Sequence, residues 1–318
     1  MKKQLITGKW NFCIVAFCIQ MLYLYGCSAQ KVVQQEGTAT STDGAPVYYK
    51  TFGKGKPLLI INGGPGMNSQ GFEGLAKQLS RNNKTIIYDQ RGTGKSVLKT
   101  LDTNTITLER MIQDMESLRK ELKIEKWVVL GHSFGGMLAS QYATLHPECI
   151  EKLILSSSGG IDLQLLTYVS ASINSKLSKT ELDSVQYWTN KIENGDTSHH
   201  ARLGRGRSLA HAYVLNKDYL PTIAERLTQG NAEVNRLIWR DLQKVNFDCA
   251  EKLRAFKQPV LIIQGKEDII KEETAEKAKK ALVNSRIVLL DHCIHYGWLD
   301  NKERYFGEIN SFLAEDDS

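Results

Sequence analysis

The segment that most constrains how this chain can fold is GHSFG, residues 131–135. It follows directly on an apolar run, residues 127–130 (WVVL), and precedes a helical pattern over about residues 135–145. Between a strand and a helix, this motif is typical of a turn so tight that small residues must flank the serine, whose side chain then projects. The start of the helix places positive potential beneath that side chain. The segment therefore predicts that Ser133 acts as a nucleophile.

Apolar runs of strand length recur along the chain and alternate with helical patterns. One of these patterns is amphipathic, since residues 107–122 repeat apolar side chains at spacings of three and four. The other strand candidates are residues 57–61, 85–88, 152–155, 260–263 and 286–290. Continuous apolar strands that alternate with helices are typical of a mostly parallel central sheet with helices on both faces.

A long segment, residues 158–250, interrupts this alternation. It is polar, helical in pattern and without a convincing buried strand. We interpret it as a helical cap inserted between two halves of one core, residues 46–157 and 251–318. Within the cap, the glycine-arginine repeat at residues 203–207 (LGRGR) is predicted to form a loop.

The first 26 residues have the pattern of a leader for export. Lys2 and Lys3 precede a mostly apolar stretch, residues 12–25, and the following LYGC segment resembles the lipobox of bacterial lipoproteins, with Cys27 as the lipidated residue. Cleavage after Ala29 and an uncleaved anchor are the alternatives. Each of them exports the body of the protein, and we expect a lipoprotein facing the periplasm or the cell exterior. The polar residues 27–45 are predicted to form a tether.

Charge and cysteine content exclude several classes of protein. The formal net charge is +6, and the three lysines of the leader account for half of it, so no nucleic-acid-binding surface is indicated. The body holds Cys149, Cys249 and Cys293, an odd number at wide spacing that selects no disulfide and matches no zinc motif. The cysteines therefore indicate no metal, and the predicted serine chemistry implies no organic cofactor.

A serine nucleophile needs a general base and an acid that orients the base. In folds where the serine follows a strand in this way, the three residues occur in the order serine, acid, histidine. The acid belongs after a late strand, where Glu267 and Asp268 lie. The base belongs after the last strand, where His292 and His295 lie, and His295 is favoured because His292 is too close to the strand end to reach over Ser133.

The oxyanion that forms during acyl transfer needs two fixed N–H donors. The backbone of Phe134, directly after the nucleophile, supplies one. The second is expected from the loop after an early strand, residues 62–66 (NGGPG), where we assign the N–H of Gly64. A phosphate-binding loop at residues 92–96 (GTGKS) is excluded, because Asp89 stands where that motif requires glycine.

Several segments together resemble the proline iminopeptidases (prolyl aminopeptidases) of the α/β-hydrolase superfamily. Residues 62–66 are similar to the family's H-G-G-P-G with Asn62 in place of histidine, residues 88–96 (YDQRGTGKS) to its D-Q-R-G-x-G-x-S, and residues 131–136 to its nucleophile motif. Residues 265–268 (GKED) and 293–299 (CIHYGWL) resemble its acid and histidine loops, which selects Asp268 and His295. The resemblance covers residues 45–157 and 245–315 and implies an α/β-hydrolase fold. Asp89 and Arg91 are interpreted as a structural pair.

The resemblance implies a peptidase that releases N-terminal residues, including proline, from short peptides. Family members bind the free α-amine with acidic side chains of the cap, for which Glu181, Glu193, Glu225 and Glu233 are the candidates here. One alternative is a carboxylesterase or lactonase that uses the same three residues on small esters. Another is a binding lipoprotein that keeps the fold without catalysis. In each case we expect a small-molecule or short-peptide partner and contact with the membrane through the lipid alone.

Overall fold

The computed structural model describes residues 34–315 of the chain. The predicted leader, the lipidation site Cys27 and the first part of the tether lie outside the described residues. Within the described part, no helix combines the length and the apolar character needed to cross a membrane.

Eight strands form one sheet in the order β1-β2-β4-β3-β5-β6-β7-β8. The pairs β1–β2 and β2–β4 are antiparallel, and every other neighbouring pair is parallel. The predicted mostly parallel sheet is therefore confirmed. The strands are β1 (Gln34–Thr40), β2 (Pro46–Phe52), β3 (Lys56–Ile61), β4 (Asn83–Tyr88), β5 (Trp127–His132), β6 (Ile150–Ser156), β7 (Val260–Gly265) and β8 (Ser285–Leu290).

The strand β1 corrects the predicted tether, which was expected to extend to residue 45. Residues 34–40 instead pair with β2 along their whole length. The polar composition of this segment fits an edge strand, because most of its side chains face solvent and only Ala39 is buried in the core.

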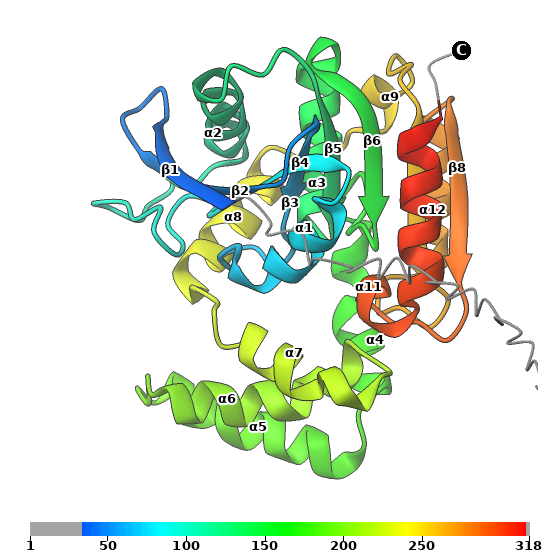
Figure 1. Ribbon diagram of the computed structural model, residues 1–318. Coiled ribbons are helices and arrows are strands. Elements are labelled where there is room, and N and C mark those ends of the chain that lie inside the picture. The colour runs from blue at the N-terminus through cyan, green and yellow to red at the C-terminus, as the bar shows by residue number, and fades with distance from the viewer. Residues whose placement is uncertain (1–33, 316–318) are drawn as a thin grey trace, which may run out of the picture. The chain divides into compact units, whose positions relative to one another are not determined.

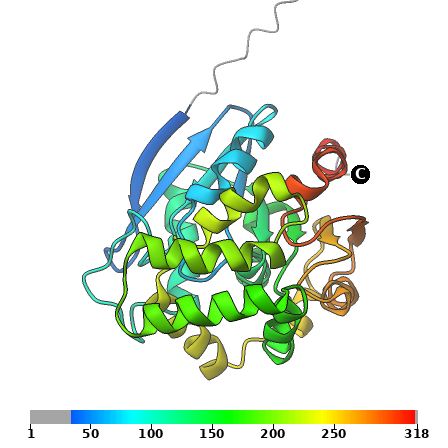
Figure 2. The same cartoon turned by 90° about the horizontal axis from the view of Figure 1, so that it is seen from below.

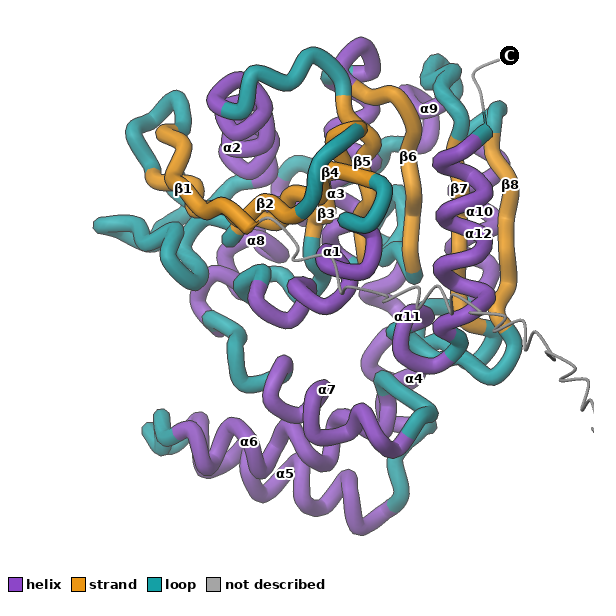
Figure 3. Tube along the Cα trace, viewed as in Figure 1, coloured by secondary structure: helices purple, strands orange, loops and turns teal. Residues whose placement is uncertain are grey.

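Helices cover both faces of the sheet, as Figure 3 shows. Alternate residues of the central strands point to opposite faces, so Leu59 and Ile61 of β3 belong to one core cluster and Leu58 and Ile60 to the other. One face is covered by α2 (Leu108–Glu121), α3 (Phe134–Leu145), α8 (Ala232–Lys244), α9 (Ala250–Leu253) and α10 (Glu272–Ala281). The other face is covered mainly by α1 (Glu73–Leu79), α11 (Gly297–Asp300) and α12 (Lys302–Ala314).

The inserted segment is helical, as predicted, but it divides into two parts. The helices α4 (Val169–Ser175), α5 (Lys179–Glu193), α6 (His199–Leu209) and α7 (Leu220–Arg226) form the cap, and α5–α7 lie beyond the carboxyl ends of the strands (Figures 1 and 2). In contrast, α8 buries Val234, Leu237 and Ile238 in the core cluster. The predicted boundary of the cap at residue 250 therefore includes a helix that packs with the core.

The predicted loop at residues 203–207 is wrong, because these residues lie inside α6. The glycines that suggested a loop allow close helix packing instead. A Cβ atom on Gly204 would stand 2.3 Å from the Trp188 ring of α5, and one on Gly206 would stand 2.5 Å from the Ala224 carbonyl oxygen of α7. Both helices therefore approach α6 more closely than a larger residue would permit.

The interpretation of Asp89 and Arg91 as a pair is also wrong. The fully buried guanidinium of Arg91 forms two hydrogen bonds with Asp114 of α2, at 2.8 Å and 2.6 Å, and two with Asp43, at 3.1 Å and 3.5 Å. The carboxylate of Asp89 instead accepts hydrogen bonds from the backbone and hydroxyl of Ser69 and from the Lys95 N–H. The ion pair Arg91–Asp114 thus joins the loop after β4 to α2.

We predict that Arg91→Met lowers the free energy of unfolding by about 3–5 kcal/mol, because it leaves the buried Asp114 carboxylate without a counter-charge. Arg110→Met is the matched control, since Arg110 pairs with Asp43 at 3.6 Å and is 37% exposed. Its loss is expected to cost less than about 1 kcal/mol. Urea unfolding measures both values, and equal costs would contradict this account.

Candidate active site

Ser133 occupies a sharp turn between β5 and α3. Its backbone has φ +54° and ψ −122°, a combination that costs energy for a residue other than glycine. The turn is held by three backbone hydrogen bonds: the Ser133 N–H donates to Ser156 O at 3.1 Å, and the Ser133 carbonyl accepts from Gly136 and Gly159 at 2.9 Å each. The predicted strand–turn–helix setting of this serine is therefore present.

Two glycines make this turn possible by close approach of the backbone. A Cβ atom on Gly131 would stand 2.3 Å from the Gly135 carbonyl oxygen, and one on Gly135 would stand 2.2 Å from the Ile61 carbonyl oxygen. Real Cβ atoms essentially never come so close to another heavy atom. The motif thus has a steric origin, since β5, α3 and the end of β3 meet behind Ser133.

The structure brings Asp268 and His295 together at the ends of neighbouring strands. Asp268 follows β7 and His295 follows β8, and the two strands are parallel neighbours. The His295 Nδ1 and the Asp268 Oδ1 are 2.8 Å apart, and their side chains are 3% and 0% exposed. The N–H of Ile270 donates to the same carboxylate oxygen at 3.1 Å. This histidine ring is consequently fixed by a buried carboxylate.

The alternative candidates for the base and the acid, His292 and Glu267, do not form such a pair. His292 is exposed, directly after β8, with φ +51°. Glu267 is also exposed, and its carboxylate accepts a hydrogen bond from the Cys293 N–H at 2.9 Å. Neither residue forms a pair like that of His295 and Asp268.

The residue before Ser133, His132, lies between the serine turn and the His295–Asp268 pair. Its ring centroid lies 4.7 Å from that of His295 and within 5.5 Å of the rings of Phe72, Tyr296 and Trp298. Burial, and to a lesser extent the proximity of His295 and Arg226, holds the pKa of His132 well below its ordinary value. His132 is therefore neutral and serves in packing, a role that the sequence motif did not indicate.

The loop predicted to supply an oxyanion donor packs directly against the serine. A Cβ atom on Gly63 would stand 2.7 Å from the Ser133 Cβ, and Gly64 has φ +71°, which favours glycine. The side chain of Asn62 donates to the carbonyls of Gly63 and Met67 at 3.1 Å and 3.0 Å. Asn62, which stands where the proline iminopeptidases have histidine, thus holds the loop through these two hydrogen bonds.

Three of the four acidic side chains proposed for amine binding interact with other residues of the inserted segment. Glu225 is exposed and contacts His199 at 3.0 Å, and Glu233 contacts Arg236. Glu181 caps α5 together with Ser178 and pairs with His211. Glu193 is exposed in the last turn of α5.

The sequence was also compared with models of known protein families. Residues 56–302 match the family described as alpha/beta hydrolase fold. The chain therefore belongs to the α/β-hydrolase family.

The relatives include proline iminopeptidases. That of Heyndrickxia coagulans is 27% identical over 275 residues, which cover 82% of this chain and 91% of the relative. That of Lactobacillus helveticus is 26% identical over 292 residues, which cover 86% and 96%. The predicted resemblance to this group is thus confirmed at the level of distant homology.

Solved structures with the same fold include enzymes of two kinds. An esterase from Exiguobacterium antarcticum aligns with a TM-score of 0.67 at 20% identity, covering 88% of this chain and 100% of that one. A proline iminopeptidase from Mycobacterium smegmatis aligns with a TM-score of 0.66 at 19% identity, covering 88% and 97%. At this identity the likeness establishes the fold alone.

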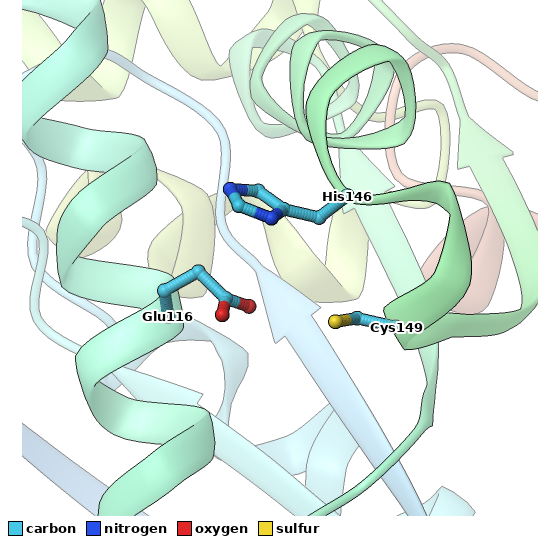
Figure 4. A group of neighbouring side chains, drawn as sticks. All are labelled: Glu116, His146 and Cys149. Carbon is cyan, nitrogen blue, oxygen red and sulfur yellow. The ribbon is translucent and has the colours of Figure 1, made fainter.

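Figure 4 shows a group of potential metal ligands, Glu116, His146 and Cys149. Glu116 of α2 faces His146 and Cys149, which follow the C-terminal end of α3, and their ligand atoms lie within 4.8 Å of one another. The 12 residues of α3, about 18 Å of helix, separate this group from Ser133. Both oxygens of Glu116 accept hydrogen bonds from Arg119 at 2.8 Å, and Tyr142 adds one at 2.5 Å. The carboxylate is already paired with a cation, so we interpret the group as structural.

Glu116 makes the stability of the fold dependent on pH. Burial opposes its ionisation, but hydrogen bonds from Arg119 and Tyr142 outweigh this effect and lower the pKa of Glu116 to about 2. Because the folded pKa lies below the ordinary value of 4.5, the carboxylate stabilises the fold fully above pH 4.5. This contribution is lost as the pH falls toward 2.

We predict that Glu116→Gln is less stable than the wild type at pH 7 and that the difference shrinks between pH 4.5 and pH 2. The slope of this change is expected to reach up to about 1.4 kcal/mol per pH unit, the value for one proton. Glu109→Gln, at an exposed position of the same helix, controls for loss of a charge. Urea unfolding at several pH values measures the difference, and a constant difference would argue against the assigned role of Glu116.

Proposed function

We propose that the protein is a serine hydrolase in which Ser133 is the nucleophile, His295 the general base and Asp268 the residue that orients the base. The observation that carries this proposal is the buried 2.8 Å contact between His295 Nδ1 and Asp268 Oδ1 beside the turn of Ser133. An Nδ1–H that donates to a carboxylate leaves Nε2 as the proton acceptor of the ring. This is the tautomer that a serine nucleophile requires.

The reaction then proceeds by acyl transfer. The Ser133 Oγ attacks the carbonyl carbon of the substrate, its proton passes to His295 Nε2, and the carbonyl electron pair moves onto the oxygen. The N–H groups of Gly64 and Phe134 stabilise this oxyanion. When the intermediate collapses, the leaving group takes the proton from His295. Water repeats the sequence on the acyl-enzyme, which releases the acid and restores Ser133.

For the substrate we propose short peptides from which one N-terminal residue is released, including proline. The support is the distant homology with proline iminopeptidases across 82–86% of this chain.

For the location of the protein we propose export and attachment to a membrane by lipid. The support is the sequence of the leader, with Cys27 as the site of lipidation.

Small esters form a second candidate class of substrate. The observation that favours them is that Glu181, Glu225 and Glu233 already contact His211, His199 and Arg236, respectively. An α-amine would have to compete with these side chains for a carboxylate, whereas an ester without an amine needs no carboxylate.

Two substrates that differ in one group separate the candidates. We expect the enzyme to cleave prolyl p-nitroanilide and to cleave its N-acetylated form at least about tenfold more slowly, since acetylation removes the amine charge. Equal rates on both, together with faster hydrolysis of p-nitrophenyl butyrate, would contradict the aminopeptidase and support the esterase.

Asp268→Asn tests the orienting role on the better substrate. We expect kcat to fall by roughly 10⁴-fold, because the amide favours the wrong tautomer of His295. Glu267→Gln, one residue away and exposed, is the matched control and should leave kcat within about threefold. A small effect of Asp268→Asn in a folded variant would oppose the proposed triad.

A further inference from the structure

Arg226, in the last turn of the cap helix α7, is a buried cation directly behind the oxyanion loop. It is 3% exposed, and its guanidinium carbon lies 5.3 Å from the centre of the Phe72 ring. Its Nη2 donates to the Gly63 carbonyl at 3.0 Å. Its Nη1 donates to the Asn68 carbonyl at 2.6 Å and to the Gln229 side chain at 2.9 Å. Two of these three acceptors are backbone carbonyls of the loop after β3.

The charge of Arg226 has no carboxylate partner at ion-pair distance within residues 34–315. Tyr296 and the more distant Asp89 are the groups that favour its charge, and the oxygens of Asp89 accept hydrogen bonds from Ser69 and Lys95 instead. Burial consequently lowers the pKa of Arg226 from its ordinary value. Arginine nonetheless remains protonated in proteins, so a full positive charge lies beside the loop.

The position of this charge bears on the oxyanion donor. The carbonyl of Gly63, which accepts from Arg226, and the N–H of Gly64 belong to the same peptide group. A cation that binds the carbonyl oxygen draws electron density through the amide and strengthens its N–H as a donor. In a site with little water, the same charge also attracts a developing oxyanion.

We propose that Arg226 is a positioning residue that fixes and polarises the Gly63–Gly64 peptide, so that the Gly64 N–H stabilises the oxyanion. This inference rests on the proposed function, because it concerns the donor of the same reaction. It also links the cap to catalysis, since Arg226 belongs to α7 and the oxyanion loop belongs to the core. A cap displaced from the core would withdraw the charge from the Gly63 carbonyl.

The experiment compares Arg226→Met with Arg226→Lys on the substrate that the wild type cleaves best. We expect Arg226→Met to lower kcat by about 10- to 100-fold, less than the loss of a whole oxyanion donor, with KM changed by less than about threefold. Affinity for a trifluoromethyl ketone analogue, whose adduct with serine carries an oxyanion, should fall by the same factor as kcat. Arg226→Lys keeps the charge and should retain more activity than Arg226→Met.

A neutral contact to the same loop provides the matched control. The Asn235 side chain of α8 donates to the Pro65 carbonyl at 2.9 Å, and that carbonyl belongs to a different peptide group. Asn235→Ala is therefore expected to leave kcat and the affinity for the ketone within about threefold of the wild type. Thermal unfolding of each variant confirms that the fold persists.

The outcomes separate this inference from the proposed function. Normal kcat in Arg226→Met, or reduced kcat with unchanged affinity for the ketone, overturns the inference while an active wild type upholds the serine hydrolase. If Arg226→Met does not fold, Arg226→Gln, which removes the charge but keeps a side-chain donor, decides: kcat and ketone affinity that fall together support the inference, whereas full activity contradicts it. A wild-type enzyme that hydrolyses no substrate overturns both.

Discussion

The arrangement around Ser133 depends on one close contact, the approach of helix α3 to the end of strand β3. A Cβ atom on Gly135 would stand 2.2 Å from the Ile61 carbonyl oxygen, so only glycine allows this approach. The chain can then turn from β5 into α3 at a single serine with φ +54°. The turn leaves Ser133 at the N-terminal end of α3, where the Phe134 N–H is among the donors that a helix leaves without an internal partner. The proposed nucleophile and one proposed oxyanion donor are therefore set by the same packing contact.

Two buried arginines show how differently this fold uses a charge. Arg91 is neutralised by Asp114 and Asp43 and joins the loop after β4 to α2. Arg226 instead donates to the carbonyls of Gly63 and Asn68, with no carboxylate of the described residues in ion-pair contact. A neutralised charge mainly holds two segments together. A charge bound to backbone carbonyls acts on the peptide groups to which they belong, and one of those is the peptide proposed to bind the oxyanion.

The sequence predicted those features whose signals are local. The turn at Ser133 follows from five adjacent residues. The places after the last strands limited the acid to Glu267 or Asp268 and the base to His292 or His295, because parallel strands bring their carboxyl ends to one edge. The resemblance to the proline iminopeptidases then selected Asp268 and supported His295. The loop predicted at residues 203–207 failed because the glycines serve contacts with Trp188 and Ala224, which are distant in sequence. Arg226 was missed for a related reason. Its acceptors are backbone carbonyls, one of them 163 residues away, and a backbone carbonyl carries no residue-specific signal.

Labelling with a fluorophosphonate probe tests the central claim most directly, since the probe reacts with activated serines. Mass spectrometry of the digested wild-type protein should place a single adduct on the peptide that contains Ser133. The adduct should be absent in Ser133→Ala, and its formation should be slowed by several orders of magnitude in His295→Gln with the fold intact. A folded wild type without an adduct on Ser133, or a His295→Gln variant that reacts at the wild-type rate, would contradict the account.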